Sequence, residues 1–164
     1  MSTPEGPRPP FVPDDFAVPR ELVTGEFRLE PLGPQHNARD YEAWTSSMEH
    51  IMATPGFAGW GWPKPMTPDD NLGDMRRHAR DFAARSGFTY TVLAGDSDRV
   101  VGCVYIYPTQ DGAPGAADVH SWVRADRAEL DVPLHDAVSA WLAEAWPFTE
   151  VRYAPRAAMG DHIP

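Results

Sequence analysis

The stretch "SWVRADRAELDVPLHDAV", residues Ser121–Val138, contains the most informative change of pattern in the sequence. It runs from an alternating, strand-like segment through a charged turn into a segment whose apolar residues recur at helical spacing. Such a strand-to-helix turn is suited to binding an anion, because the first N–H groups of a helix have no partners within the helix. Glycine usually serves there, because it lets the backbone approach the ligand. This turn has no glycine and carries three acids, so its capacity to bind an anion is the question that the sequence poses.

Alternating and helical patterns continue on both sides of this stretch. The alternation predicts strands, and the helical spacing predicts helices, in the order strand, helix, helix, strand, strand, strand, helix, strand. The second helix has clear start signals, since Thr67 can cap it, Pro68 fits its first turn and two acids follow; Gly87 is expected to end it. This order predicts an α/β fold with helices packed on one sheet. The expected strands are 27–32, 88–94, 100–108, 117–124 and 151–155, and the expected helices are 35–53, 68 onward and 133–146.

Composition divides the chain into three parts. Residues 1–26 are rich in proline and predict an extended N-terminal arm, which apolar side chains such as Phe11, Val12, Phe16 and Val18 would hold against the body. Residues 27–155 are expected to form the single domain that a chain of 164 residues implies. Residues 156–164 are expected to be a flexible tail.

The overall charge limits the partners. A formal net charge of −10 makes nucleic acid an unfavourable partner and amines favourable ones. We expect no membrane association, because no window is apolar enough to span a bilayer and no secretion signal is present. The only cysteine, Cys103, excludes an internal disulfide and indicates a reducing, cytoplasmic location. It is interpreted as a small buried apolar residue.

Three segments together carry a family resemblance: "FRLEPLGPQH" (27–36), "RVVGCVYIY" (99–107) and "AADVHSWVR" (116–124), followed by the helix and strand of residues 133–155. In order and local pattern they resemble the GNAT superfamily of acyl-CoA N-acyltransferases, in particular its ribosomal-protein-acetyltransferase (RimJ/RimL-like) branch. The resemblance implies a mixed, mostly antiparallel sheet flanked by helices, with acetyl-CoA as co-substrate. The family continues past its fifth strand with a further helix and two strands, so this chain is expected to be a C-terminally truncated version.

The resemblance also assigns the opening stretch to the coenzyme. It implies that the backbone of Ser121, Trp122 and Val123 holds the acyl arm, and that Arg124 and Arg127 face the phosphates. The family's glycine-rich loop corresponds to residues 127–132, where only Arg127 agrees with its pattern. Leu130, Asp131 and Val132 bring side chains to the turn that the phosphates would approach. Asp131 is also expected to cap the following helix through its carboxylate.

Candidate catalytic groups lie on the same strand. The resemblance implies that Asp118 is the base that deprotonates the incoming amine; the alternative is a turn residue at the start of the strand. His120 shares a face with Asp118 by the strand period, so it is either a partner of this base or a half-buried polar residue. Tyr153 is a candidate for protonating the departing thiolate, although the family's tyrosine comes later in the chain.

A loop of glycine, proline and tryptophan predicts a substrate wall. Trp60 and Trp62, in "GFAGWGWPKP", are typical of a lid that contacts apolar or cationic ligands, or of a loop anchored over the core. Tyr105 and Tyr107 share a strand face and either line the same pocket or pack in the sheet. No metal is expected, because the six histidines show no ligand spacing with one another or with Cys103.

Two main hypotheses follow. The first is an N-acyltransferase, in its simplest form an N-acetyltransferase, that moves an acyl group from acyl-CoA to the amine of a small molecule or peptide. The second is a GNAT-fold protein that transfers no acyl group and serves as a small-molecule binder or regulatory module. Such a protein could form a homodimer through the sheet edge where the family's last strands are missing. A third keeps the cleft but uses it for other acid–base chemistry.

Overall fold

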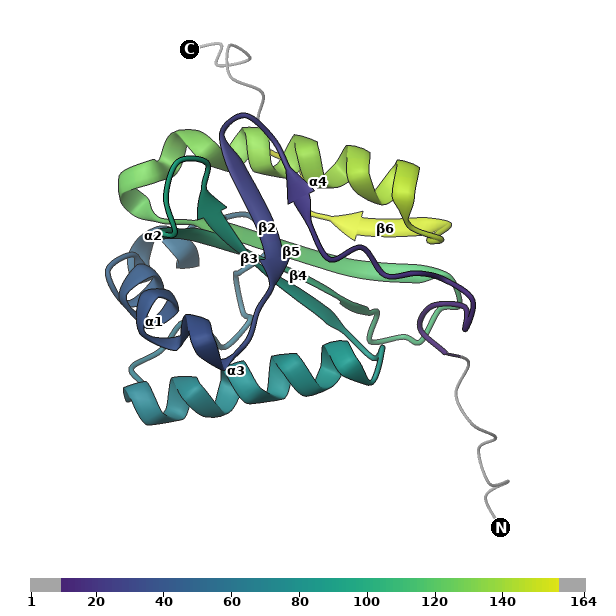
Figure 1. The fold of residues 1–164 in the computed structure, drawn as a ribbon, viewed down its shortest axis with the longest axis horizontal. Helices are drawn as coiled ribbons and strands as arrows, with labels where there is room; N and C mark the ends of the chain where they lie inside the picture. The colour runs from purple at the N-terminus through teal and green to yellow at the C-terminus, as the bar shows by residue number, and fades with distance from the viewer. Residues whose placement is uncertain (1–9, 157–164) are drawn as a thin grey trace.

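The computed structural model describes residues 10–156, which form one six-stranded sheet with helices on both faces (Figure 1). The strands lie in the order β1-β2-β3-β4-β5-β6, and every neighbouring pair is antiparallel except β5 and β6, which are parallel. This confirms the expected mixed, mostly antiparallel sheet. The strands are β1 (Leu22–Val23), β2 (Phe27–Pro31), β3 (Phe88–Ala94), β4 (Val100–Pro108), β5 (Ala116–Val123) and β6 (Glu150–Tyr153).

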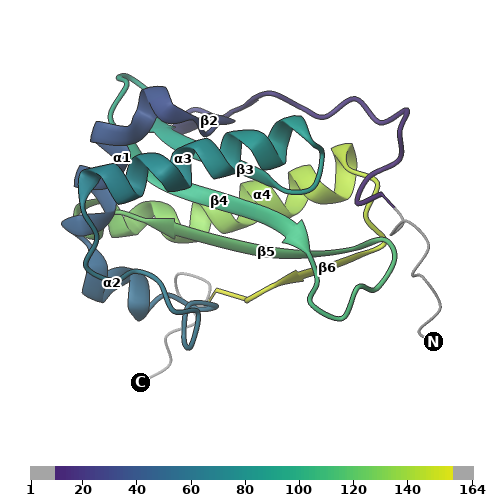
Figure 2. The same cartoon turned by 90° about the horizontal axis from the view of Figure 1, so that it is seen from below.

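The helices α1, α2 and α3 cover one face of the sheet and α4 covers the other (Figures 1 and 2). The single helix expected over 35–53 is instead divided at Ser46 and Ser47. The hydroxyl of Ser46 donates to the Ala43 carbonyl, and the Ser47 Oγ accepts from the backbone N–H of Ala125. Serine hydroxyls compete in this way with helical hydrogen bonds. The helices are η1 (Pro34–His36), α1 (Asn37–Thr45), α2 (Met48–Met52), α3 (Pro68–Ala83), η2 (Ala125–Leu130) and α4 (Asp131–Ala145).

Helix α3 begins as its sequence predicts and ends differently. The Thr67 Oγ1 accepts from the Asp70 N–H, and the Asp70 carboxylate accepts from the Thr67 N–H, which completes a capping box. The expected cap at Gly87 is wrong, because the left-handed residue after the helix is Arg85, with φ of 60°. Gly87 serves packing instead, since a Cβ there would lie 2.1 Å from the ring of Tyr107.

Alternation along β5 gives the two faces of the sheet different contents. Val119 and Val123 join the apolar cluster beneath α4, together with Leu134 and Val138 of that helix. Trp122 joins a second cluster on the α1–α3 face, which also holds Cys103, buried as expected. Gly102 permits this packing, because a Cβ there would lie 2.4 Å from the Trp122 carbonyl oxygen. Asp118 and His120 therefore project on the face of α1 and α3.

The N-terminal arm is packed on the body over its described part. Val12 is fully buried, and Phe11, Phe16 and Val18 pack against the cluster beneath α4. The Arg85 guanidinium donates to two carbonyl oxygens of the arm, and the Tyr90 hydroxyl donates to a third. Residues 1–9 of the expected arm and residues 157–164 of the expected tail lie outside the described residues.

Candidate active site

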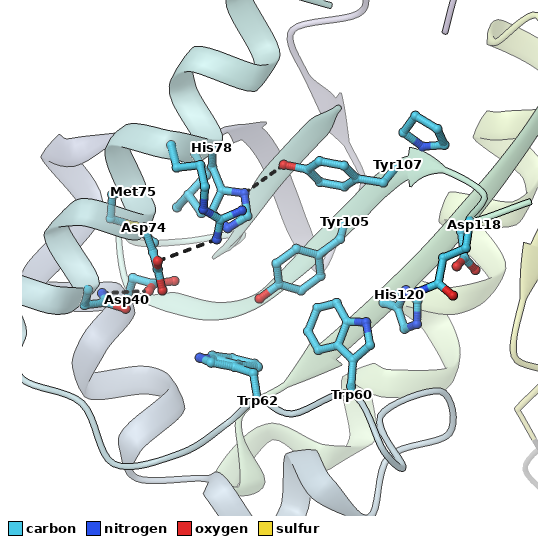
Figure 3. A pocket seen from close by; sticks show the side chains of 15 residues that line it. Asp40, Trp60, Trp62, Asp74, Met75, His78, Tyr105, Tyr107, Asp118 and His120 are labelled. Atoms are coloured by element: carbon cyan, nitrogen blue, oxygen red, sulfur yellow. Dashed lines mark hydrogen bonds and ion pairs between the residues drawn. The ribbon is translucent and has the colours of Figure 1, made fainter. Parts of the chain in front are cut away.

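A pocket of about 350 Å³ opens on the face of the sheet that carries α1 and α3 (Figure 3). Its walls come from α1, α3, β4, β5 and the loop that follows α2. Asp118, His120, Trp60, Trp62 and Tyr105, all singled out from the sequence, line it together. The other lining residues are Leu32, Asp40, Asn71, Asp74, Met75, Arg77, His78, Tyr107, Pro108 and Gln110.

The tryptophan loop is both anchored and part of the pocket wall. The Trp62 ring lies 5.2 Å from that of Trp44 and 6.1 Å from that of Trp122, both of which are fully buried. Trp60 is 38% exposed and stacks on His120 with ring centroids 4.8 Å apart. The two alternatives left open for this loop are therefore compatible, because one tryptophan anchors it and both face the pocket.

One end of the pocket is acidic, a feature that the sequence reasoning missed. Asp40 is 3% exposed, and its Oδ2 accepts from the Asn71 Nδ2 at 3.1 Å. Asn71 is held in turn by the Trp44 Nε1, which donates to its Oδ1 at 3.0 Å. Burial raises the pKa of Asp40 to about 7; the Asn71 hydrogen bond opposes this rise and the neighbouring Asp74 adds to it. The signal in the sequence was an acid four residues before Trp44, on the buried face of a helix.

His78 forms a rigid, uncharged part of the wall. Its Nδ1 lies 3.0 Å from both the Tyr107 hydroxyl and the Thr89 hydroxyl. Burial lowers the pKa of His78 to about 4, with Arg77 contributing and Asp81 opposing, so the ring is neutral near pH 7. The Tyr107 hydroxyl donates to Asp81 at 2.8 Å. The tyrosine thus both packs and lines the pocket.

The other end of the pocket carries Asp118 and His120 (Figure 3). Burial lowers the pKa of His120, against the opposing effect of Asp118, so its ring favours the neutral form. Tyr153, the third catalytic candidate, lies on the opposite face of the sheet, where its ring contacts His135 of α4. The Tyr153 hydroxyl is 2.5 Å from the Ser121 Oγ, and burial raises its pKa to about 12. The structure thus brings two of the three candidates together.

Strands β5 and β6 pair only as far as Val119 and Tyr153, and beyond that point a buried arginine bridges them. The Arg156 guanidinium donates to the Ser121 carbonyl oxygen, to the Ala154 carbonyl oxygen and to Asp131, each at 2.8 Å. Its side chain is 3% exposed. The backbone carbonyl expected to hold an acyl arm is therefore already occupied by a side chain of the same chain.

The start of α4 differs from the sequence expectation. Asp131 does not cap the helix, because the cap position is Leu130 and no side chain serves it. The Asp131 carboxylate is bonded to Arg156 instead. Leu130 is 1% exposed and belongs to the core beneath α4, so its side chain points away from any ligand at the turn. Val132 is half-buried in the first turn of α4.

The two arginines expected to face phosphates have acidic partners. The guanidinium of Arg124, which is 5% exposed, donates to both carboxylate oxygens of Glu42, at 2.9 and 2.8 Å, and to Asp126 at 3.1 Å. These hydrogen bonds, with Glu42 the largest contributor, raise the pKa of Arg124 further. Arg127 lies 3.1 Å from Glu129. This leaves Arg124 as a structural link between α1 and η2.

Among residues 10–156, no three His, Cys, Asp or Glu side chains form a group that could hold a metal ion. No helix in the same range has the length and apolar character needed to cross a membrane.

No protein-family model matches the sequence, and no curated protein sequence matches it. Solved structures that match the fold include several acetyltransferases. The ribosomal-protein-S5-alanine acetyltransferase from Vibrio fischeri has a TM-score of 0.58 and 13% identity, over 76% of this chain and 68% of that one. The Salmonella typhimurium enzyme that modifies the N-terminal serine of ribosomal protein L7/L12 has a TM-score of 0.60 and 8% identity, over 77% and 69%.

A third such structure is the microcin C7 self-immunity acetyltransferase in complex with acetyl-CoA and AMP, with a TM-score of 0.57 and 12% identity over 77% of this chain and 67% of that one. At these identities the likeness concerns the fold. The chain has the GNAT acetyltransferase fold, of the type found in ribosomal-protein acetyltransferases, as its sequence resemblance implied.

Proposed function

We propose that this protein is a GNAT-type N-acyltransferase that moves an acyl group, in the simplest case acetyl, from acyl-CoA to the amine of a small molecule or peptide. The observation that carries the proposal is the position of Asp118 and His120. They lie at one end of an open pocket with aromatic walls, on the strand whose pairing with β6 ends at Val119. Several solved structures of the same fold are acetyltransferases, which supports the proposal.

The chemistry assigned to this end of the pocket is proton removal. An alkylammonium has no lone pair, so it must lose a proton before it can attack an acyl carbon. Asp118 lies on the pocket surface beside His120, and burial lowers the pKa of His120, so its neutral ring can accept a proton. We assign Asp118 as the base and His120 as its neighbour that passes the proton onward. Tyr153 would act as the acid, from the other side of the diverging strands.

The residues present suit the acyl arm of an acyl-CoA better than they suit its phosphates. When bound, this co-substrate supplies a thioester with an electrophilic acyl carbon. The backbone of Ser121–Val123 lies where the strands diverge and would hold the acyl arm, provided that Arg156 releases the Ser121 carbonyl. The phosphate end fits poorly, because Asp131 and Glu129 stand at the turn and Arg127 and Arg156 are paired with them. We derive no step from contacts with the phosphates.

A second candidate is a GNAT-fold protein that binds amines in the pocket and transfers no acyl group. The ion pair between Arg156 and Asp131 favours it. The Arg156–Asp131 pair is 3% and 19% exposed at its two side chains, and it links the start of α4 to β5 through the Ser121 carbonyl oxygen. Breaking a buried ion pair costs several kcal/mol in stability when one of its charges is left without a partner. For this second candidate, the amine pocket is retained, and Arg156 occupies the place beside Ser121 where the acyl arm of the coenzyme would bind.

Calorimetric titration with acetyl-CoA, at low and at moderate salt, separates the two. The acyltransferase requires binding at or below millimolar concentration, and the phosphate contribution should weaken as salt rises. Absence of any binding at millimolar acetyl-CoA would contradict the acyltransferase and leave the amine-binding protein. A parallel titration with pantetheine, which lacks the phosphates, reports the acyl-arm half of the cleft alone.

A further inference from the structure

Asp40 is a buried acid at the inner end of the pocket, and no cationic side chain among residues 10–156 forms an ion pair with it. Within residues 10–156 its one hydrogen-bond donor is the Asn71 amide. The nearest arginine of the pocket, Arg77, is directed to Asp74, with 3.5 Å between the guanidinium and that carboxylate. Buried carboxylates are normally paired or hydrogen-bonded to cations, because an isolated buried charge is very costly. The inner end of the pocket therefore carries a carboxyl group for which a bound ligand can supply the cationic partner.

Aromatic rings flank this acid. Figure 3 shows Tyr105 and Trp62 between the Asp40 end and the Asp118 end of the pocket. Their ring centroids are 6.4 Å apart, and Trp60 lies 5.1 Å from Tyr105. Tyr105 is fixed by the Trp122 Nε1, which donates to its hydroxyl at 2.9 Å. Aromatic faces attract organic cations and also cover their apolar parts.

We propose that the inner end of the pocket binds the ammonium group of an organic amine, with Asp40 as its counterion and Trp62 and Tyr105 as its aromatic walls. The acid at the opposite end, Asp118, then meets a second amine of the same molecule (Figure 3). The residues of β4 that line the pocket run from Tyr105 to Pro108, about 10 Å of strand. The ligand class is therefore a flexible aliphatic amine with cationic groups at both ends.

This assignment rests on the proposed function only for the fate of the second amine. As an acyltransferase, the protein would acylate the amine at Asp118 while the ammonium at Asp40 sets the position of the chain. As an amine-binding protein, it would hold the same ligand unchanged. Binding at Asp40 is therefore testable without acyl-CoA.

The ionisation of Asp40 gives the subsite a pH dependence. The groups that face it are Asp74, Arg77 and His78 from α3 and Cys103 and Tyr105 from β4. His78 is neutral near pH 7, and burial raises the pKa of Cys103 and that of Tyr105, so neither of them ionises there. Asp40 itself changes charge near pH 7. A cation favours the carboxylate form, so affinity rises about tenfold from pH 6 to pH 8.

The test compares α,ω-diaminoalkanes with n-alkylamines of equal chain length, titrated calorimetrically into the full-length protein without acyl-CoA at pH 8. The wild type should bind the best diamine at least tenfold more tightly than the matching monoamine. Asp40→Asn should remove that preference, and Asp69→Asn, an exposed acid on α3, should keep it. Far-UV circular dichroism confirms that each variant is folded.

Three results would overturn the subsite: no amine binding, equal binding of diamine and monoamine by the wild type, or an unchanged preference in Asp40→Asn. If Asp40→Asn does not fold, the wild-type comparison of pH 6 with pH 8 decides, and a flat affinity counts against the proposal. Diamine preference without acyl transfer retains the subsite and rejects the acyltransferase. Acyl transfer with equal rates for monoamines and diamines would retain the acyltransferase and reject the subsite at Asp40.

Discussion

The pocket and the turn that joins β5 to α4 differ in how their charged side chains are paired. On the pocket side, Asp40 and Asp118 face a cavity and have no cationic partner within the described residues. On the side where β5 leads into α4, the arginines are held by acids of the same chain: Arg124 by Glu42, Arg127 by Glu129 and Arg156 by Asp131. Among the described residues, the pocket thus presents acids without a cationic partner, whereas the arginines near the start of α4 are already paired with acids.

The largest expected effect is on turnover. Asp118→Asn should lower the rate of amine acylation by about 10²–10⁴-fold, because it removes a general base, while acetyl-CoA affinity stays nearly unchanged. Steady-state rates with saturating acyl-CoA, together with calorimetry, give both values. Asp96→Asn, in an exposed turn between β3 and β4, is the matched control. Unchanged turnover would remove Asp118 from the mechanism.

The next effect is on stability and pH. The folded-state pKa of Asp40, about 7, lies above its model-peptide value of 3.8, so between those pH values the native protein holds more protons than the unfolded chain. The free energy of unfolding therefore falls as pH rises from about 4 to 7, and it loses nothing from this group below that window.

Asp40→Asn should abolish this loss and be more stable than the wild type at pH 8 by about 2–4 kcal/mol. Urea unfolding at pH 5 and pH 8, followed by tryptophan fluorescence, measures it. A wild type and a variant with parallel pH profiles would show that Asp40 ionises normally.

A smaller effect is expected in the coenzyme cleft. Asp131→Asn removes the acidic partner of Arg156 and should raise acetyl-CoA affinity about tenfold, because the positive charge of Arg156 is then no longer neutralised and attracts the phosphates. Leu130 is left in place, since it is a core residue whose removal would leave a cavity. Glu144→Gln, exposed near the end of α4, controls for a general change in charge. Equal affinities for the three proteins would mean that the phosphates bind elsewhere.

The smallest effect on folding should come from Trp60. Because its side chain is 38% exposed, Trp60→Ala should lower the free energy of unfolding by less than about 1 kcal/mol. It should nevertheless weaken amine binding several-fold, since a wall of the pocket is lost. Trp44→Ala, at a fully buried site, should cost about 3–5 kcal/mol and serves as the contrast. Unfolding curves and amine titrations on the two variants test this separation.

The fold was predictable because its signals are local and repeated. Alternation in β3, β4 and β5, and the capping box at Thr67, each report the backbone directly. The errors came from longer contacts. The break at Ser46 and Ser47 depends on a hydrogen bond to Ala125, and the left-handed Arg85 is held by carbonyls of the arm some 70 positions earlier. Neighbouring residues carry no sign of such partners.

Of the candidate active site, only the end that carries Asp118 and His120 was predictable from the sequence. Asp118, His120, Trp60 and Tyr105 meet in the pocket, as their strand and loop positions suggested. Asp40 was missed, because an acid in a helix is usually assigned to solvent; only its place on the buried face, beside Trp44, distinguishes it. The role of Arg156 depends on the close approach of β5, α4 and the chain after β6, which is a tertiary property.

The pairing of β1 with β2 has a consequence for assembly. Leu22 and Val23 lie against Leu29 and Arg28, so the chain itself provides the neighbour for the β2 edge. An unpaired edge invites strands from other molecules, and a short covering strand prevents this. The proline-rich arm thus covers the β2 edge of the sheet and leaves only the two residues of β1 as the strand edge on that side.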